Sequence, residues 1–595
     1  MLKEALEHNN FVDNDVLLGQ SAEKRAIWNE MFVCRAEMEE IFKNNPSTAS
    51  VGTRELDVLC TIASFLLVRV SEYNNPFDIS FNDLGKIDID GDIISFVMTS
   101  NIDGVWSKLL ALLNKHEQNI FALNVLLRNA SDPNATPIGI TDLATILMDV
   151  KPDINVAELC CGPGVVIDTI KEAVPSIKAT GYEVDLSCIA VAKARNYLSA
   201  NPIAYVKSDV FNLVNSDNIV PQYDRIFANY PFGQRLRDLN AGKGYLSTLT
   251  QRIPSMSKAT SSDWLYNMLI TEMLSKDGRA VGIMTNGSTW NMIDAPIRQY
   301  FIENGLIECV IALPAKLFYN TSIATSMIVL SHGNKGVRLV DASEQFTAGR
   351  RTNELSESDV DAIISMIETD SEKSFFVDNK TLSENDYVLN TNRYIIGADS
   401  SKEGIAFESI IKRITRGAPM NARQLDDLSS NIPTNMQYLM ISNIQDGLID
   451  SNLPYLSRVD KKNEKYCLSD RCLIMSKNGF PYKVAVAEVK NNQQIMANGN
   501  LYIIELDLEK VDPYYLAAFF SSENGTALLK SISVGATVPN IGVEQLKKLS
   551  IPLPSIEEQK KIADEYKRAR DEIMMLQLKL EKARNRMMHI FEEEV

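Results

Sequence analysis

The stretch "VAELCCGPGVVIDTIKEA", Val156 to Ala173, decides the fold. Its apolar start predicts a buried strand, its glycines predict a turn, and the apolar spacing after them predicts a helix. Gly162 and Gly164 let the backbone approach a ligand closely, and the helix amino end that follows offers free N–H groups. A dinucleotide-binding turn has a third glycine near position 167, where this chain has Ile167. The unit therefore predicts an α/β sheet and disfavours NAD as its ligand.

Similar short apolar runs, separated by helix-length segments, extend from Thr141 to Ser331. This alternation is typical of a doubly wound α/β sheet. We expect its domain to span residues 126–335 and the polar residues 336–404 to form a linker or tail. The predicted strands are "NVAELC", "KATGYEV", "IAYVKSD", "RIFANY", "AVGIMT", "CVIALP" and "SMIVLS".

The remaining regions follow other patterns. Residues 1–125 have apolar side chains every three or four positions and predict a helical domain, whereas residues 405–554 predict a mixed α/β domain rich in strands. Residues 555–595 predict one helix of roughly 60 Å. Such a helix packs on its own domain or pairs with another long helix, in the same chain or across a dimer. Its apolar seam, spaced four and three apart as in a coiled coil, is Ile562, Tyr566, Ala569, Ile573, Leu576, Leu580, Ala583, Met587 and Ile590.

Composition limits the class of protein. With 595 residues, 45% of them hydrophobic, the chain is long enough for several folded domains. It shows no membrane-helix window and no signal-peptide pattern, so we expect a cytoplasmic protein. The eight cysteines are scattered without a CxxC pair, so we expect no metal site and no disulfides. The net charge of −17 lies entirely before residue 405, which leaves a neutral last third that permits a basic face for nucleic acid.

Acidic residues end three successive predicted strands: Glu158, Glu183 and Asp209. A carboxylate beside the glycine turn suits a ligand ammonium group, and one after the second strand suits a ribose diol. A carboxylate after the third strand suits the amine of an adenine ring. A ligand with an ammonium group, a ribose and an adenine is S-adenosylmethionine, so we expect this cofactor.

The fourth predicted strand ends in "ANYPF", which places Asn229 beside the cofactor edge of the sheet. The Asn229 amide oxygen and the Tyr230 backbone carbonyl together accept both hydrogens of a planar amine, and the ring of Phe232 stacks on its base. This arrangement suits methylation of an exocyclic base amine without a strong general base. A turn with a core aromatic is the structural alternative.

The order of these motifs resembles the modification subunit of Type I restriction-modification systems, a γ-class DNA adenine-N6 methyltransferase. The similarity covers about residues 1–400 and implies a Rossmann-like S-adenosylmethionine-dependent methyltransferase sheet behind a helical domain. It implies cofactor contacts from Thr136, Pro137, Glu158, Gly162, Gly164, Glu183 and Asp209. It implies catalytic roles for Asn229, Tyr230, Pro231 and Phe232. Tyr230 departs from the family pattern, which has proline there. We expect Phe318 or Tyr319 to supply a second stacking face for the base, with a core aromatic as the alternative.

The end of the chain, with "IPLPSIEEQKKIADEYKRARDEI", resembles half of a Type I specificity subunit: a target recognition domain and a spacer helix. This implies double-stranded DNA as substrate, a homodimer through the C-terminal helix and a split recognition sequence. No Gly-x-x-x-x-Gly-Lys-Ser/Thr loop is present, so an ATP-dependent restriction subunit would be a separate partner. A basic group suited to DNA phosphates, or to plain solvation, is Lys461, Lys462, Lys465, Arg471, Lys477 and Lys483.

Three alternatives remain at this point. Asp470, Glu488 and Lys490 have the residue types of a metal-dependent nuclease, although their spacing is loose. A catalytically impaired DNA-binding or scaffold protein of a defence system is favoured by Tyr230 alone. Methylation of RNA or of a protein amide would use the same catalytic motif but would not need the last third of the chain.

Overall fold

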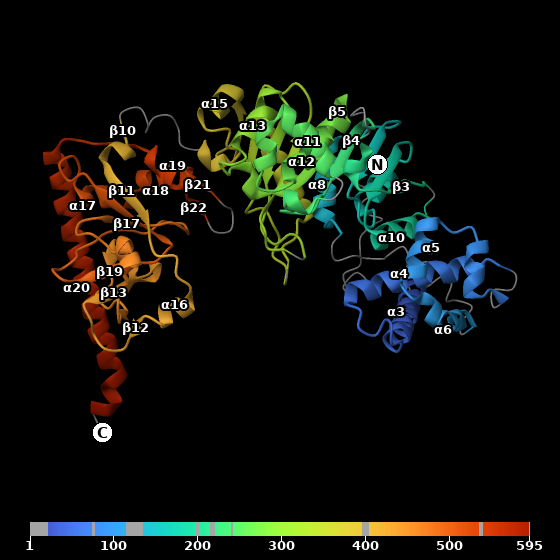
Figure 1. The fold of residues 1–595 in the computed structure, drawn as a ribbon, viewed down its shortest axis with the longest axis horizontal. Helices are drawn as coiled ribbons and strands as arrows, with labels where there is room; N and C mark the ends of the chain where they lie inside the picture. Colours follow the sequence, from blue (N-terminus) through green and yellow to red (C-terminus); the bar gives the residue numbers. More distant parts are fainter. Residues whose placement is uncertain are drawn as a thin grey trace. The chain divides into compact units, whose positions relative to one another are not determined.

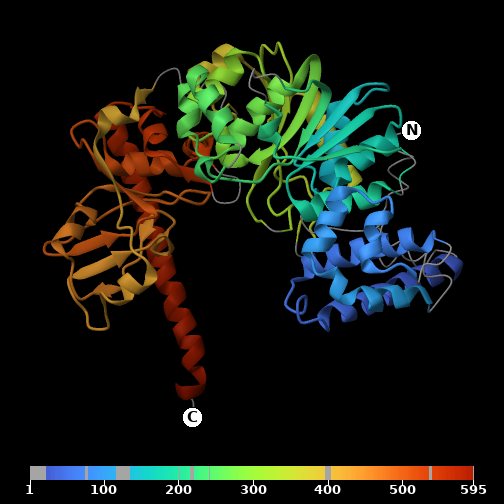
Figure 2. The same cartoon turned by 45° about the vertical axis from the view of Figure 1, so that its right-hand side comes forward.

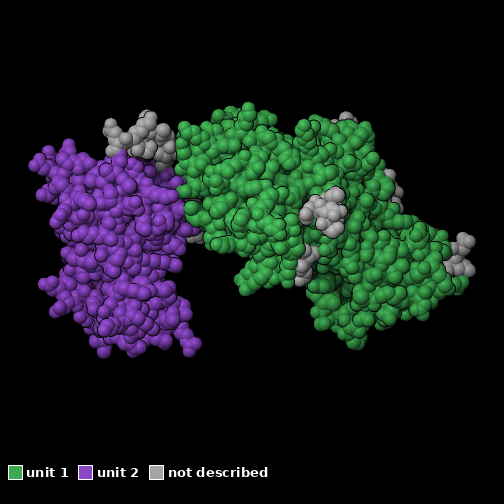
Figure 3. Space-filling model, turned by 45° about the horizontal axis from the view of Figure 1, so that its top comes forward, with its two compact units in different colours: residues 1–389 green, residues 390–595 purple. Residues whose placement is uncertain are grey.

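The computed structural model describes residues 22–73, 78–114, 135–197, 199, 201–214, 220–239, 242–319, 321–350, 352–394, 404–534 and 539–593. The chain forms two compact units, Met1–Leu389 and Asn390–Val595, which Figure 3 colours separately. Within the described ranges, none of the helices has the length and apolar character needed to cross a membrane.

The first unit is built on a nine-stranded mixed sheet in the order β3-β2-β1-β4-β5-β7-β6-β8-β9 (Figures 1 and 2). Strands β7 and β9 run antiparallel to their neighbours, and the other strands run parallel to one another. The seven predicted strands are confirmed. The strands are β1 (Asn155–Leu159), β2 (Lys178–Glu183), β3 (Ala204–Lys207), β4 (Tyr223–Ala228), β5 (Leu274–Thr285), β6 (Ile307–Ala312), β7 (Thr325–Leu330), β8 (Gly336–Asp341) and β9 (Ser374–Asp378).

The expectation that residues 336–404 form a linker or tail of the catalytic region is wrong for residues 336–384. Strands β8 and β9 extend the main sheet, and α14 (Glu357–Glu368) between them packs on α8 (Ile138–Met148). Strand β9 lies at the edge of the sheet, where Phe376 is 53% exposed.

Both faces of the sheet are covered, because the consecutive residues Ile226 and Phe227 of β4 are each fully buried. Side chains from α8, α9 (Val165–Ala173) and α14 share one core with Phe227. The other helices of this region are α10 (Leu186–Asn196), α11 (Gly242–Arg252), α12 (Asp263–Met273), α13 (Ala295–Glu303) and α15 (Asn379–Glu384).

Helix α10 supplies side chains to two cores. Ile189 and Ala192 belong to the core of the sheet, whereas Ala190, Val191 and Ala194 belong to the core of the amino-terminal helices. Those helices are α3 (Ala22–Lys43), α4 (Thr53–Ser71), α5 (Gly91–Thr99) and α6 (Trp106–Leu110). The predicted helical segments before residue 22 and between residues 115 and 134 lie outside the described residues.

The second unit contains two four-stranded sheets, in the orders β11-β20-β17-β18 and β12-β16-β13-β19. Their strands are β11 (Ile411–Arg416), β20 (Leu501–Leu506), β17 (Leu473–Ser476), β18 (Val484–Val486), β12 (Ser429–Ser430), β16 (Tyr455–Leu456), β13 (Met436–Leu439) and β19 (Gln494–Ala497). Two-residue strands add β10 (Ile405–Ala406), β14 (Ile444–Gln445), β15 (Leu448–Ile449), β21 (Ser533–Val534), β22 (Asn540–Ile541) and β23 (Ser550–Ile551). The helices are α16 (Ala422–Asp426), α17 (Pro513–Ser521), α18 (Glu523–Ser531), α19 (Val543–Lys547) and α20 (Ile556–Glu593).

Helix α20 has 38 residues, and its first half packs on α17 of its own domain. The packed face includes Tyr566 of the predicted seam together with the fully buried Ala563, whereas Ile562 of the seam is 43% exposed. Beyond residue 571 the helix extends away from the rest of its unit (Figures 1 and 2), with Leu576 and Leu580 more than half exposed.

Candidate active site

The strand order reverses between β1 and β4, which are adjacent parallel strands. In open α/β sheets, ligands bind beyond the carboxyl ends of the strands at such a point. Leu159, the last residue of β1, pairs with Ala228, the last residue of β4. The glycine turn and Asn229 therefore leave the sheet side by side, about 4.8 Å apart in strand spacing.

Glycine occurs at positions 162 and 164 of the turn for different structural reasons. Gly162 has a φ of +54°, and a Cβ added to it would meet nothing within 4 Å. Gly164 has a φ of +80°, and its added Cβ would lie 2.1 Å from the hydroxyl oxygen of Tyr205. Gly162 therefore leaves open space for a ligand, whereas packing against Tyr205 by itself requires a glycine at position 164.

Two of the predicted carboxylates hold the turn. The carboxylate of Glu158 accepts a hydrogen bond of 2.9 Å from the Ile167 N–H in the first turn of α9. Glu183 accepts three backbone hydrogen bonds of 2.8 Å each, from Gly162, Val184 and Asp185. Burial raises the pKa of Glu158 well above its ordinary value, and the nearby carboxylates of Asp168 and Glu183 add to the rise. A cation beside Glu158 would relieve this cost of the ionised form.

Asp209 follows β3 and caps the next turn by accepting a hydrogen bond of 3.0 Å from the Phe211 N–H. Pro137 is the N-cap residue of α8, and Thr136 precedes it. The Asn229 amide nitrogen donates a hydrogen bond of 3.0 Å to the Thr136 hydroxyl. Among the described residues this is the only side-chain hydrogen bond of Asn229, so its amide oxygen stays available to an amine donor.

Tyr230 turns its side chain into the protein. Its ring is 1% exposed and stacks on the ring of Tyr266, with 4.7 Å between centroids and 4° between planes. Its hydroxyl donates a hydrogen bond of 3.0 Å to Asn267, and burial raises its pKa well above the ordinary value. Tyr266 and Asn267 were missed as site residues, because nothing in the segment "SSDWLYNML" marks them as partners of Tyr230.

The remaining residues of the motif lie at the surface. Pro231 is exposed, and Phe232 is half-buried. The Phe232 ring meets the edge of Phe318 with centroids 5.0 Å apart, and Phe318 is 8% exposed. Phe318 therefore supports Phe232, whereas Tyr319, which is 56% exposed, lies at the surface.

The six predicted basic residues of the second unit do not form one group with free charges. Lys461, Lys462 and Lys465 are exposed on one short helix. Arg471 forms an ion pair of 3.5 Å with Asp512, and the Lys483 ammonium donates to the Ile441 carbonyl at 3.1 Å. Lys477 is half-buried, and burial lowers its pKa.

Two residues of the nuclease alternative, Glu488 and Asp470, make structural contacts instead. The Glu488 carboxylate forms an ion pair of 2.8 Å with Arg570, which joins the recognition domain to α20. Asp470 accepts a hydrogen bond of 3.0 Å from the Val489 N–H. Searched over the described residues alone, the chain shows no cluster of three or more His, Cys, Asp or Glu side chains that would hold a metal ion.

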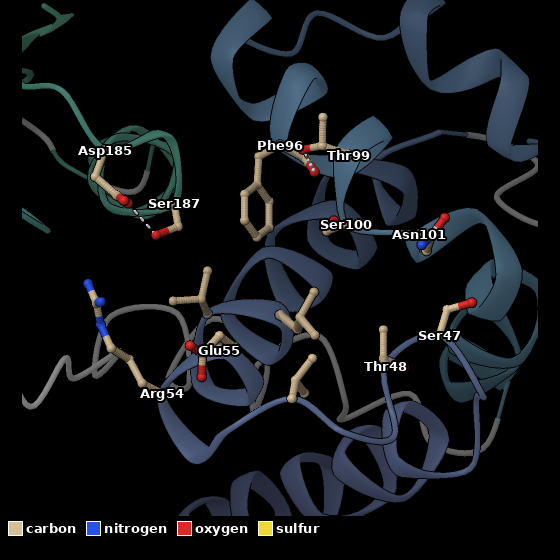
Figure 4. Close-up of a pocket in the computed structure, with 13 residues that line it drawn as sticks. Ser47, Thr48, Arg54, Glu55, Phe96, Thr99, Ser100, Asn101, Asp185 and Ser187 are labelled. Carbon is tan, nitrogen blue, oxygen red and sulfur yellow. Dashed lines mark hydrogen bonds between the residues drawn. The ribbon is translucent and has the colours of Figure 1, made fainter.

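A separate cavity of about 390 Å³ lies between α4, α5 and the start of α10 (Figure 4). Arg54, Phe96 and Asp185 are among its lining residues. None of the sequence-predicted site residues lines it, so the cavity is distinct from the edge of the sheet where Asn229 lies.

Two family models match the chain. Residues 134–403 match the N-6 DNA methylase family, and residues 427–581 match the Type I restriction modification DNA specificity domain. The chain is therefore similar to an N-6 DNA methylase in one part and to a Type I specificity domain in another. The match to the N-6 DNA methylase family supports S-adenosylmethionine as the cofactor.

Curated relatives match the methylase part. The Type I restriction enzyme MpnII methylase subunit of Mycoplasma pneumoniae is 21% identical over 48% of this chain and 57% of its own length. The MjaVIII methylase subunit of Methanocaldococcus jannaschii is 24% identical over 47% of this chain and 52% of its own length. The chain thus spans about half the length of these relatives. A type I methyltransferase subunit from Streptococcus thermophilus has 18% identity and a TM-score of 0.43, over 66% of this chain and 98% of that structure.

The residues of the N-6 DNA methylase domain fit this cofactor. Gly162 leaves room at the turn, and Glu158 is a buried carboxyl whose ionised form needs a cation such as the cofactor's ammonium group. Glu183 uses three acceptor positions on backbone N–H groups, and a carboxylate has about four, so one remains for a ribose hydroxyl.

Proposed function

We propose that the chain is a site-specific DNA adenine-N6 methyltransferase that serves as the modification and recognition arm of a restriction-modification system. The observation that carries the proposal is the register of β1 and β4, which ends both strands at Leu159 and Ala228. That register places Asn229 next to the glycine turn, which we assign to the cofactor. The N-6 DNA methylase and specificity matches support both halves of the proposal.

In this proposal, S-adenosylmethionine, when bound, would supply the methyl group: its bond to the sulfonium sulfur breaks as the bond to nitrogen N6 forms, and S-adenosylhomocysteine leaves. Thr136 holds the Asn229 amide nitrogen, so the amide oxygen faces the substrate. That oxygen and the Tyr230 carbonyl accept the two N–H groups of the adenine amine. Phe232, supported by Phe318, stacks on the base. The nitrogen loses one proton to water after transfer, so this chain needs no strong general base.

The target adenine is paired inside the duplex and must be flipped out to reach these residues. The specificity domain supplies the choice of sequence, with Lys461, Lys462 and Lys465 as candidate phosphate contacts. One chain carries one recognition domain and one long helix. Pairing of two copies through the exposed end of α20 would restore two domains and predict a split, two-fold symmetric site. A separate ATP-dependent restriction subunit is the proposed further partner.

Expression in cells that lack DNA methylation, followed by sequencing of their DNA for modified adenine, tests the proposal. We expect N6-methyladenine in one split motif. Asn229→Ala should lose the modification and keep cofactor binding, measured by calorimetry with S-adenosylmethionine. A wild-type chain that binds the cofactor and modifies no adenine would refute the enzymatic function and favour a scaffold.

A further inference from the structure

Tyr230 stands where the resembled family has proline, and its backbone carbonyl is one of the two proposed amine acceptors. Proline fixes φ through its ring, and tyrosine does not. In this chain the side chain of Tyr230 is instead held at both ends. Its ring is stacked on Tyr266, and its hydroxyl is bonded to Asn267.

Helix α12 holds the catalytic segment at a second point. The Ser262 N–H, just before the helix, donates a hydrogen bond of 2.8 Å to the Gln234 carbonyl. The segment from Tyr230 to Gln234 is thereby attached at its start and at its end to the first two turns of one helix. Tyr266 is 6% exposed and Asn267 is fully buried, so both are fixed by the packing around them.

The start of α12 is itself fixed to the sheet. The Asp263 carboxylate accepts hydrogen bonds of 3.0 Å from the Thr285 N–H and from the Ser288 hydroxyl. The Trp264 indole N–H donates to the Ser288 carbonyl at 3.3 Å. The start of α12 is therefore fixed relative to the end of β5. The Tyr230 side chain, which contacts this helix, is fixed with it.

We infer that Tyr266 and Asn267 are positioning residues, which act through the Tyr230 side chain to hold the backbone carbonyl that accepts the adenine amine. This inference rests on the proposed methyltransferase function. The contacts of the Tyr230 side chain restrain the backbone at this position, as the proline ring does in the resembled family. A displacement of about 1 Å at a reacting group costs on the order of 100-fold in rate, so loosening this hold lowers kcat without changing the cofactor's own contacts.

The first test removes the hydrogen bond and keeps the ring. Tyr230→Phe and Asn267→Leu are each expected to lower kcat about tenfold, with tritiated S-adenosylmethionine and DNA that carries the recognised motif. The KM for the cofactor should stay within twofold. The double variant replaces both polar partners by apolar groups, so its Tm should recover toward wild type. Its kcat should stay as low as in the single variants.

A matched control loses a comparable bond at the other end of β4. The Tyr223 hydroxyl bonds the Tyr182 hydroxyl at 2.7 Å, and both side chains are buried. Tyr223→Phe should lower the Tm and leave kcat unchanged. All rates are compared well below the Tm of each variant.

Tyr230→Pro is expected to lower kcat more than Tyr230→Phe does. It restores the family residue, yet it leaves the Tyr266 face and the Asn267 oxygen without their partner, so kcat should fall about 100-fold. Wild-type kcat in both Tyr230→Phe and Tyr230→Pro would overturn the positioning role alone, and so would a double variant that recovers kcat together with Tm. A wild-type chain that methylates no DNA would overturn the proposed function and this inference together.

Discussion

Replacing Glu158 by glutamine tests the cofactor site while leaving its frame intact. The amide oxygen of glutamine still accepts the Ile167 N–H, which is 2.9 Å from the carboxylate, so that buried donor keeps its partner. The substitution removes the negative charge. A hydrogen bond to a charged group contributes about 1.5–3 kcal/mol. The Kd for S-adenosylmethionine should therefore rise by roughly 10- to 150-fold.

The pH dependence of stability gives a second readout of Glu158→Gln. A carboxyl whose pKa is raised by folding binds more protons in the folded state than in the unfolded state. The free energy of unfolding without cofactor therefore falls as the pH rises above the unfolded value of about 4.3. In the glutamine variant, the free energy of unfolding should not show the decrease with pH that the Glu158 carboxyl causes. The variant should therefore be more stable than wild type at neutral pH. Cofactor affinity of the wild type should weaken on acidification, because protonation removes the charge that the ammonium group contacts.

Calorimetric titration with S-adenosylmethionine, together with urea unfolding at several pH values, measures both effects. Glu308→Gln is the matched control, because it breaks the ion pair between Glu308, near the amino-terminal end of β6, and Arg279 in the middle of β5. The control should change stability and leave the Kd unchanged. A Glu158→Gln protein that binds the cofactor within twofold of wild type would refute the assignment of Glu158 to the ammonium group.

Three further predictions concern packing and assembly. Gly164→Ala should lower the Tm, because its Cβ would collide with Tyr205, and unchanged melting would contradict the packing explanation. Arg570→Ala should reduce the free energy of unfolding of the second unit by about 1 kcal/mol in urea titrations, since it loses the ion pair with Glu488. Ending the chain at Asp571 removes the exposed part of α20 and keeps the packed part, so light scattering should show monomers; unchanged assembly would exclude the helix-paired dimer.

The inner strands of the sheet were predictable because both of their faces are buried. Burial on two faces produces continuous apolar runs, such as that around Phe227, and these stand out in a sequence. Strands β8 and β9 were missed because they lie in a stretch that is polar on average, and their apolar runs are short: Leu339-Val340 in β8 and Phe375 to Val377 in β9. The pairing of β7 between β5 and β6 depends on contacts far apart in the chain, which the apolar pattern does not encode.

The candidate site was predictable in its residue types and only partly in its contacts. Gly162 and Gly164 look alike in the sequence, and only the position of Tyr205 separates their roles. The contacts of α20 were equally hard to predict. The apolar pattern favours burial of the larger Ile562, but the buried side chain is that of Ala563. The ring of Tyr230 needed its partner on α12 before its inward direction could be known.

Helix α10 makes the glycine turn and the amino-terminal helices parts of one cooperative structure. A chain beginning at residue 135 would leave Ala190, Val191 and Ala194 without their covering side chains. The same helix carries Arg195, which donates a hydrogen bond of 2.9 Å to the Pro163 carbonyl inside the turn. In a calorimeter, the first unit should therefore melt in a single transition that S-adenosylmethionine moves to higher temperature. The temperature at which the amino-terminal helices melt would then depend on whether S-adenosylmethionine is bound at the glycine turn.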